Sequence, residues 1–180
     1  MKTSKFFFSF TALLLSLFCS SLQASAYDYS DNYSSYYYDG TTEMEDALRK
    51  GHAAATLEDY VKAESYYLQA ADLGSAEAQC ALGLIYSDSS LTLYDPAKAF
   101  YCFNESAQNG YSYGKYYLAI CHLYGIFTDT DYVEGFYWLK QAADEYVDEA
   151  IYIIDQIKTT SLSLQSILAE LYSYNYYPGI

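Results

Sequence analysis

The stretch LGLIYSDSSLTLYDPAKAFYCFNESAQNG (82–110) recurs in altered form as LAICHLYGIFTDTDYVEGFYWLKQAA (118–143), 36 residues further along the chain. The same spacing aligns three sets of small or apolar positions: Ala63 with Ala99 and Gly135, Ala71 with Ala107 and Ala143, and Leu82 with Leu118 and Ile154. A fixed period in this range is typical of proteins that stack copies of one structural unit and is not expected of a single closed core. The period therefore predicts a stacked repeat architecture.

Helix signals fill the chain from about residue 42 to residue 173. Strand-like alternation is nearly absent, and an acid that suits a helix N-terminus stands at Asp95 and at Asp131. The segments are punctuated by Gly74, Gly110 and Gly125. We expect helices near 43–55, 59–73, 76–87, 96–109, 113–124, 131–145, 147–158 and 161–173.

Several positions of the two long units follow a known repeat motif. The first contains Leu82-Gly83-x-x-Tyr86, Asp95, Lys98-Ala99 and Ser106-Ala107, and the second contains Leu118-Ala119-x-x-His122, Gly125, Asp131, Glu134-Gly135, Trp138 and Ala142-Ala143. In these positions the chain resembles the Sel-1-like repeat, a relative of the tetratricopeptide repeat. The opening unit has the shorter spacing of a tetratricopeptide unit, with Gly51, Ala54, Tyr60, Ala63, Tyr67 and Ala70. Departures from the family pattern are Ser89 and Leu91 at loop glycine positions and Cys102 at an aromatic position.

The resemblance implies an all-α fold, a right-handed α/α solenoid of stacked antiparallel helix pairs over residues 42–160. A helix at 161–173 would cap the last apolar face, and 174–180 would form a tail. Small residues such as Gly83 and Ala119 let paired helices approach closely. Aromatic side chains fill the wedges between pairs: Tyr66, Tyr67, Phe103 and Trp138.

The N-terminal segment 1–26 has the features of a secretory signal peptide. Lys2 and Lys5 precede an apolar run from Phe6 to Phe18, and small residues end the segment at Ala26. Two alternatives are a membrane anchor, for which the run is short of the roughly 20 residues needed, and a lipoprotein site at Cys19. We expect the chain to be exported to the periplasm or the extracellular space. Residues 27–41, rich in Tyr, Ser and Asp, are expected to be disordered, or else to act as a partner-binding arm.

The chain is strongly acidic, with 9 basic against 23 acidic residues and a net charge of −14. Cleavage after Ala26 would remove two lysines and leave 7 against 23, which is −16. Such a chain repels nucleic acid and anionic lipid head groups, so nucleic acid is not an expected partner. No apolar stretch after residue 26 is long enough to cross a membrane. We expect a monomer that binds no cofactor or metal.

The resemblance also implies where a partner binds, because solenoids of this kind use the concave face lined by the first helix of each pair. Transferring the tetratricopeptide facing pattern predicts a groove lined by Leu48, His52, Glu77, Leu84, Tyr113, Tyr116, Ile120, Glu149 and Tyr152, with Glu45, Cys80, Ser87 and Gln156 alongside. Tyrosines and aliphatics edged by carboxylates suit a protein or peptide with apolar anchors and some Lys or Arg. For each single residue, the alternative is an ordinary core or surface role.

Family members act as envelope regulators, as assembly factors or as factors that engage host proteins, so an exported scaffold of this kind is the leading functional hypothesis. The alternatives are a module that binds cell-envelope glycan or peptidoglycan, and a weak β-lactam-type hydrolase. The sequence contains only two histidines, His52 and His122, and neither belongs to an H-E-x-x-H motif. We therefore do not expect an enzyme.

Three cysteines follow residue 26, and none forms a C-x-x-C pair. On the repeat frame, Cys102 and Cys121 fall on adjacent helices and Cys80 on the groove face. This placement predicts a Cys102–Cys121 disulfide with Cys80 free, against the alternative of three buried unpaired thiols.

Overall fold

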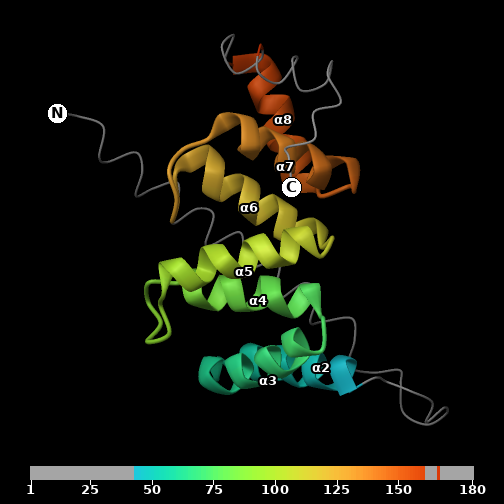
Figure 1. Ribbon diagram of the computed structural model, residues 1–180, viewed down its shortest axis with the longest axis vertical. Coiled ribbons are helices and arrows are strands. Elements are labelled where there is room, and N and C mark those ends of the chain that lie inside the picture. The colour runs from blue at the N-terminus through green and yellow to red at the C-terminus, as the bar shows by residue number, and fades with distance from the viewer. Residues whose placement is uncertain (1–42, 161–165, 167–180) are drawn as a thin grey trace.

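The computed structural model describes residues 43–160 and residue 166. Within residues 43–160 the chain forms α-helices and no strands, and the helices stack in chain order along the long axis of the molecule (Figure 1). They are α2 (Glu43–Thr56), α3 (Tyr60–Asp72), α4 (Ala76–Ser87), α5 (Pro96–Gln108), α6 (Ser112–Tyr124), α7 (Tyr132–Asp144) and α8 (Asp148–Thr160). The expected helices over this range are confirmed to within one or two residues at each end. The expected signal peptide, the Tyr-rich segment and the tail lie outside the described residues, as does the capping helix at 161–173 except for Ser166.

Polar side chains begin the helices as the sequence pattern indicates. Asp95 accepts a hydrogen bond from the backbone N–H of Lys98, and Asp131 accepts from two N–H groups at the start of α7. Asp59 and Ser75 cap α3 and α4 in the same way. The three punctuating glycines all have positive φ: 96° at Gly74, 88° at Gly110 and 63° at Gly125. A left-handed residue of this kind ends a helix and turns the chain back.

The two helices of each pair approach at a small residue that faces a large one. A Cβ added at Gly51 would lie 2.6 Å from the ring of Tyr67, and one added at Gly83 would lie 2.6 Å from the ring of Phe103. Both rings are buried. The hairpins thus close because glycine leaves room for an aromatic side chain on the second helix.

Successive pairs are tied by contacts that repeat with the 36-residue period. Asn109 donates to Gln79 at 2.9 Å, and one period later Lys115 pairs with Glu145. The position of Tyr86 follows the same rule. Its hydroxyl donates to Glu64 at 2.7 Å, and one period later the ring of His122 packs edge-on against Phe100, with centroids 5.6 Å apart. The same pairs of repeat positions therefore meet in successive units, although a hydrogen bond in one unit is replaced by an ion pair or a ring contact in the next.

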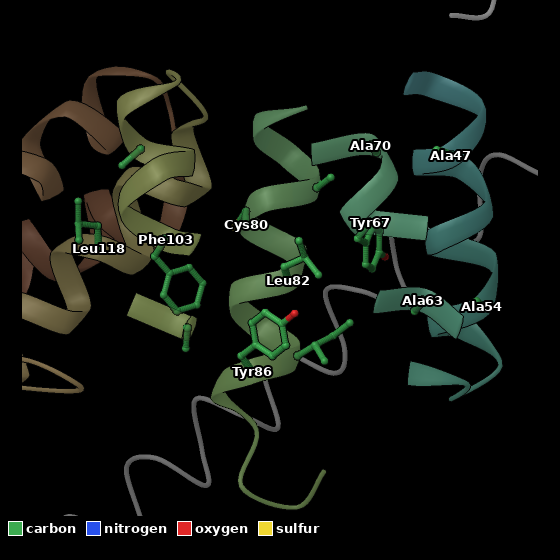
Figure 2. Close-up of a cluster of buried hydrophobic side chains, with 14 of the residues drawn as sticks. Ala47, Ala54, Ala63, Tyr67, Ala70, Cys80, Leu82, Tyr86, Phe103 and Leu118 are labelled. Atoms are coloured by element: carbon green, nitrogen blue, oxygen red, sulfur yellow. The ribbon is translucent and has the colours of Figure 1, made fainter. Parts of the chain in front are cut away.

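The buried side chains follow the stack from α2 to α8. Figure 2 shows the part of this core that runs from Ala47 on α2 through Leu82 on α4 to Leu118 on α6. A second cluster joins α6 and α7 to α8 and includes Ala119, Phe136, Leu139, Ala150 and Ile154. Each pair therefore buries its apolar residues against its neighbours, as expected of a solenoid.

The loop 88–95, which has Ser89 and Leu91 where glycines were expected, closes in the same way as the loop 125–131. The N–H of Asp95 donates to the carbonyl of Tyr86 at 2.9 Å, and in the loop 125–131 the N–H of Asp131 donates to His122 at the same distance. Asp88 replaces the missing glycine turn by accepting from the N–H and hydroxyl of Ser90. The first pair has only the short turn 57–59, as its tetratricopeptide-like spacing predicts.

Candidate partner-binding face

The residues predicted to bind a partner belong to α2, α4, α6 and α8, and we call the side formed by these residues the first-helix face. The repeat register aligns Glu77 on α4 with Tyr113 on α6 and Glu149 on α8. Each of the three is the second residue of its helix. They form one row across successive units.

Side-chain exposure divides the predicted residues into two groups. Tyr113 is 41% exposed and Tyr152 is 64% exposed, and Glu149 is also exposed. The remaining accessible residues are half-buried: Leu48, His52, Glu77 and Leu84. These seven residues are open to a partner in the described part of the chain.

Tyr116 and Ile120 are not exposed, contrary to the groove role predicted for them. Tyr116 is 5% exposed and Ile120 is 8% exposed. Both belong to the buried cluster that includes Ala150, Ile154 and Ile157 of α8. The predicted facing pattern placed them outward, whereas both lie in the core that α6 shares with α7 and α8.

The N-terminal end of the first-helix face is organised by His52. Its Nε2 lies 3.1 Å from Glu77 Oε1, and its Nδ1 lies 3.0 Å from the hydroxyl of Tyr67. The two rings meet edge-on with centroids 5.4 Å apart. Burial and the carboxylate of Glu77 raise the pKa of Tyr67, so its hydroxyl remains a neutral hydrogen-bonding group. The contacts join α2, α3 and α4 and hold Glu77 in place.

The centre of the first-helix face is a group of tyrosines on and just before α6. The rings of Tyr111 and Tyr113 are 6.1 Å apart, those of Tyr116 and Tyr117 are 5.1 Å apart, and Tyr117 stacks on Phe103 at 5.1 Å. Burial and then Glu149 raise the pKa of Tyr116 to about 12. Tyr113, which is exposed, and Tyr111, which is half-buried, supply aromatic contact area that suits peptide or protein binding, whereas Tyr116 belongs to the core.

Two of these tyrosines, Tyr111 and Tyr117, were not among the residues that sequence reasoning selected. Tyr111 holds the N-cap position of α6, where the preceding repeat has the capping residue Ser75. A tyrosine there makes no side-chain cap hydrogen bond. N-cap positions favour Ser, Thr, Asp or Asn, so a tyrosine at this repeat position could have identified Tyr111 as a candidate from the sequence.

The C-terminal end of the first-helix face is acidic. Burial first, and then the carboxylates of Glu149 and Asp148, raise the pKa of the Tyr113 hydroxyl. The two acids open α8, and Tyr152 lies one turn further along the same helix. Neither acid forms an ion pair with any residue in 43–160.

Cys80, Cys102 and Cys121 are free thiols, so the structure does not contain the predicted Cys102–Cys121 bridge. Cys121 is buried inside α6, and burial alone raises its pKa to about 12. Cys102 is half-buried, and its pKa is raised to about 11, first by burial and then by Glu105. Cys80 is itself buried and does not line the first-helix face.

His122 packs where the preceding repeat has Tyr86. Its Nδ1 is buried without a hydrogen-bond partner, and burial lowers its pKa although Glu134 and Asp131 act against that shift. Within residues 43–160, no three His, Cys, Asp or Glu side chains are grouped so as to hold a metal ion. Among the described helices, none combines the length and apolarity that a bilayer span requires.

Comparison with known proteins agrees with the repeat assignment. Two solved structures share the fold. A Sel1 repeat protein from Oxalobacter formigenes is 20% identical over 63% of this chain and 88% of that chain, with a TM-score of 0.56. The protein c5321, a protective antigen of uropathogenic Escherichia coli strains displaying an SLR fold, is 25% identical over 71% of this chain, with a TM-score of 0.57. The matched region spans only 30% of c5321. A search of the curated proteins found no match.

The family model for the Sel1 repeat matches residues 25–75, 76–111 and 112–146. The three matches contain the pairs α2–α3, α4–α5 and α6–α7 in turn. Sel1 repeat proteins are generally scaffolds for protein interaction and are typically not catalytic. From its three consecutive repeats and its stacked helix pairs, the chain belongs to the Sel1 repeat family.

Proposed function

We propose that this protein is an exported scaffold that binds a protein or peptide through its first-helix face. The observation that carries the proposal is the exposure of Tyr113 and Tyr152. Both are large aromatic side chains at positions that a solenoid uses for binding, and neither is needed to close the buried core. Tyrosine supplies large contact area at low conformational cost. Roles as an envelope regulator, an assembly factor or a host-engaging factor all fit such a scaffold.

Export rests on the features of residues 1–26, a basic start, an apolar run and a small-residue end. If it is correct, the protein isolated from the envelope or the medium will begin at Tyr27. Mass spectrometry of the intact protein gives that mass directly. A protein that keeps residues 1–26 after fractionation would contradict cleavage.

The binding role is tested by partner capture with two double variants. Tyr113→Ala/Tyr152→Ala removes the exposed rings of the first-helix face. Tyr101→Ala/Tyr132→Ala removes two rings on the second helices α5 and α7, which are 61% and 46% exposed. Quantitative mass spectrometry of captured envelope and host proteins should show partners lost from the first variant and retained by the second. If the first variant keeps every partner of the wild type, binding through this face is wrong.

A further inference from the structure

The C-terminal end of the first-helix face carries charge that the described chain does not neutralise. Tyr116 of α6 and Ala150 of α8 lie in the same buried cluster, which brings the first turns of the two helices together. Tyr113 is one turn before Tyr116, and Asp148 and Glu149 directly precede Ala150. Tyr152 follows Glu149 by three residues and Asp148 by four on α8. The nearest cation along α6 is Lys115, which is buried and paired with Glu145. Two carboxylates therefore border two exposed aromatic rings with no cation engaged.

Two carboxylates on the neighbouring helices α4 and α7 have partners. Glu77 contacts His52, and Glu134 accepts from the indole N–H of Trp138 at 2.7 Å. The acids that open α8 gain from the helix dipole, which accounts for their place in the sequence. It does not account for exposed tyrosines beside them, because a half-desolvated ring next to unpaired carboxylates is the surrounding that a guanidinium or ammonium group favours.

The two segments that directly flank residues 43–160 contain no lysine or arginine. Residues 27–42 contain Asp28, Asp31 and Asp39 and no Lys or Arg. Residues 161–180 contain Glu170 and again no Lys or Arg. A chain with 23 acidic against 9 basic residues also repels a second copy of itself. Charge complementarity therefore favours a basic segment of another molecule.

We propose that the partner of the first-helix face is a basic peptide segment that places an Arg or Lys side chain between Tyr113 and Tyr152, against Asp148 and Glu149. The cation pairs with the carboxylates and lies over the tyrosine rings. Apolar side chains of the same segment contact the tyrosines toward Tyr111. This inference rests on the proposed function and names the chemistry of the partner.

The test measures fluorescence anisotropy of a labelled 12-residue peptide that alternates leucine with arginine, with the whole protein. Its matched control alternates leucine with citrulline, which has the shape of arginine without its charge. The protein variant Asp148→Asn/Glu149→Gln removes the two charges at the site. Glu58→Gln/Asp72→Asn removes two exposed charges near the other end of the stack and changes the net charge equally. Thermal unfolding of both variants reports whether α8 remains folded.

The arginine peptide should bind the wild type, and the site variant should weaken it by roughly tenfold, the scale of one charge-assisted contact. The control variant should change binding by less than about twofold, because exposed charges act weakly at a distance. Equal losses in both variants would mean diffuse attraction and would overturn the proposal. So would equal binding of the citrulline peptide, or no binding of either peptide. Partner capture that still depends on Tyr113 and Tyr152 would then leave the proposed function intact.

Discussion

Substituting Gly83 by alanine tests how the helix pairs close. The new methyl group would lie 2.6 and 2.7 Å from two ring carbons of Phe103, about 1 Å inside the roughly 3.5–4.0 Å that carbon atoms prefer. The ring cannot easily retreat, because it is 3% exposed and stacks on Tyr117. The first pair repeats this arrangement between Gly51 and Tyr67.

Two effects oppose each other in this variant. Overpacking a core costs roughly 1–3 kcal/mol, and replacing glycine by alanine inside a helix gains roughly 1 kcal/mol. Because Phe103 is buried and stacked on Tyr117, we expect the upper part of the overpacking range and a net loss of about 1–2 kcal/mol in the free energy of unfolding. Ordinary helix propensity alone would predict the opposite sign.

The third pair suggests the compensating change. The register that puts Phe103 opposite Gly83 puts Leu139 opposite Ala119, and both of these residues are fully buried. The double variant Gly83→Ala/Phe103→Leu copies that combination. The double variant should therefore lose less free energy of unfolding than the sum of the losses in Gly83→Ala and Phe103→Leu. We expect the difference, which is the coupling energy, to be about 1–2 kcal/mol.

Urea unfolding followed by far-UV circular dichroism gives the free energy of unfolding of the wild type, the two single variants and the double variant. The comparison holds if the slope of that free energy against urea concentration is the same in all four. The reasoning about close approach would be refuted if Gly83→Ala were more stable than the wild type. It would also be refuted if the two single effects added to within about 0.5 kcal/mol.

Three further predictions concern stability and thiol reactivity. Burial lowers the pKa of His122 below its unfolded value, so below about pH 6.5 the unfolded state binds more protons and the folded state should become less stable as pH drops. In thermal melts, His122→Phe should lose less melting temperature between pH 7.5 and pH 5.5 than the wild type loses. Asp131→Ala removes a cap that accepts two N–H groups and should cost about 1 kcal/mol in urea unfolding, whereas an unchanged midpoint would contradict the cap. Alkylation at pH 8 should modify Cys102 slowly in the native state and Cys80 and Cys121 only after unfolding, while a Cys102–Cys121 disulfide would protect both of its residues until reduction.

Much of the fold could be predicted because small residues and helix stops leave clear marks in the sequence. The 36-residue alignment of Ala63, Ala99 and Gly135 located the second helices, and the left-handed glycines located the turns. Asp95 and Asp131 fixed two helix starts. These are local requirements, so a single sequence reports them directly.

The binding face was predicted less completely because exposure depends on what packs next. Tyr116 and Ile120 occupy repeat positions that were predicted to face outward, yet they lie in the buried cluster that α6 shares with α7 and α8. The disulfide prediction had the same weakness, since helix adjacency says little about where two thiols point. Tyr111 was missed because its position normally belongs to a helix cap.

The second residues of α4, α6 and α8 occupy the same repeat position, so comparing them distinguishes a residue kept for binding from one kept for helix stability. Glu77 and Glu149 occupy a site where any acid is favoured by the helix dipole, so their presence alone argues little for a partner. Tyr113 stands in the same row without that benefit, partly exposed and beside two unpaired carboxylates. Replacing it with glutamate would restore the helix preference and add repulsion at the site. A Tyr113→Glu protein that unfolds no more easily than the wild type but fails to bind its partner would show that this position is kept for binding.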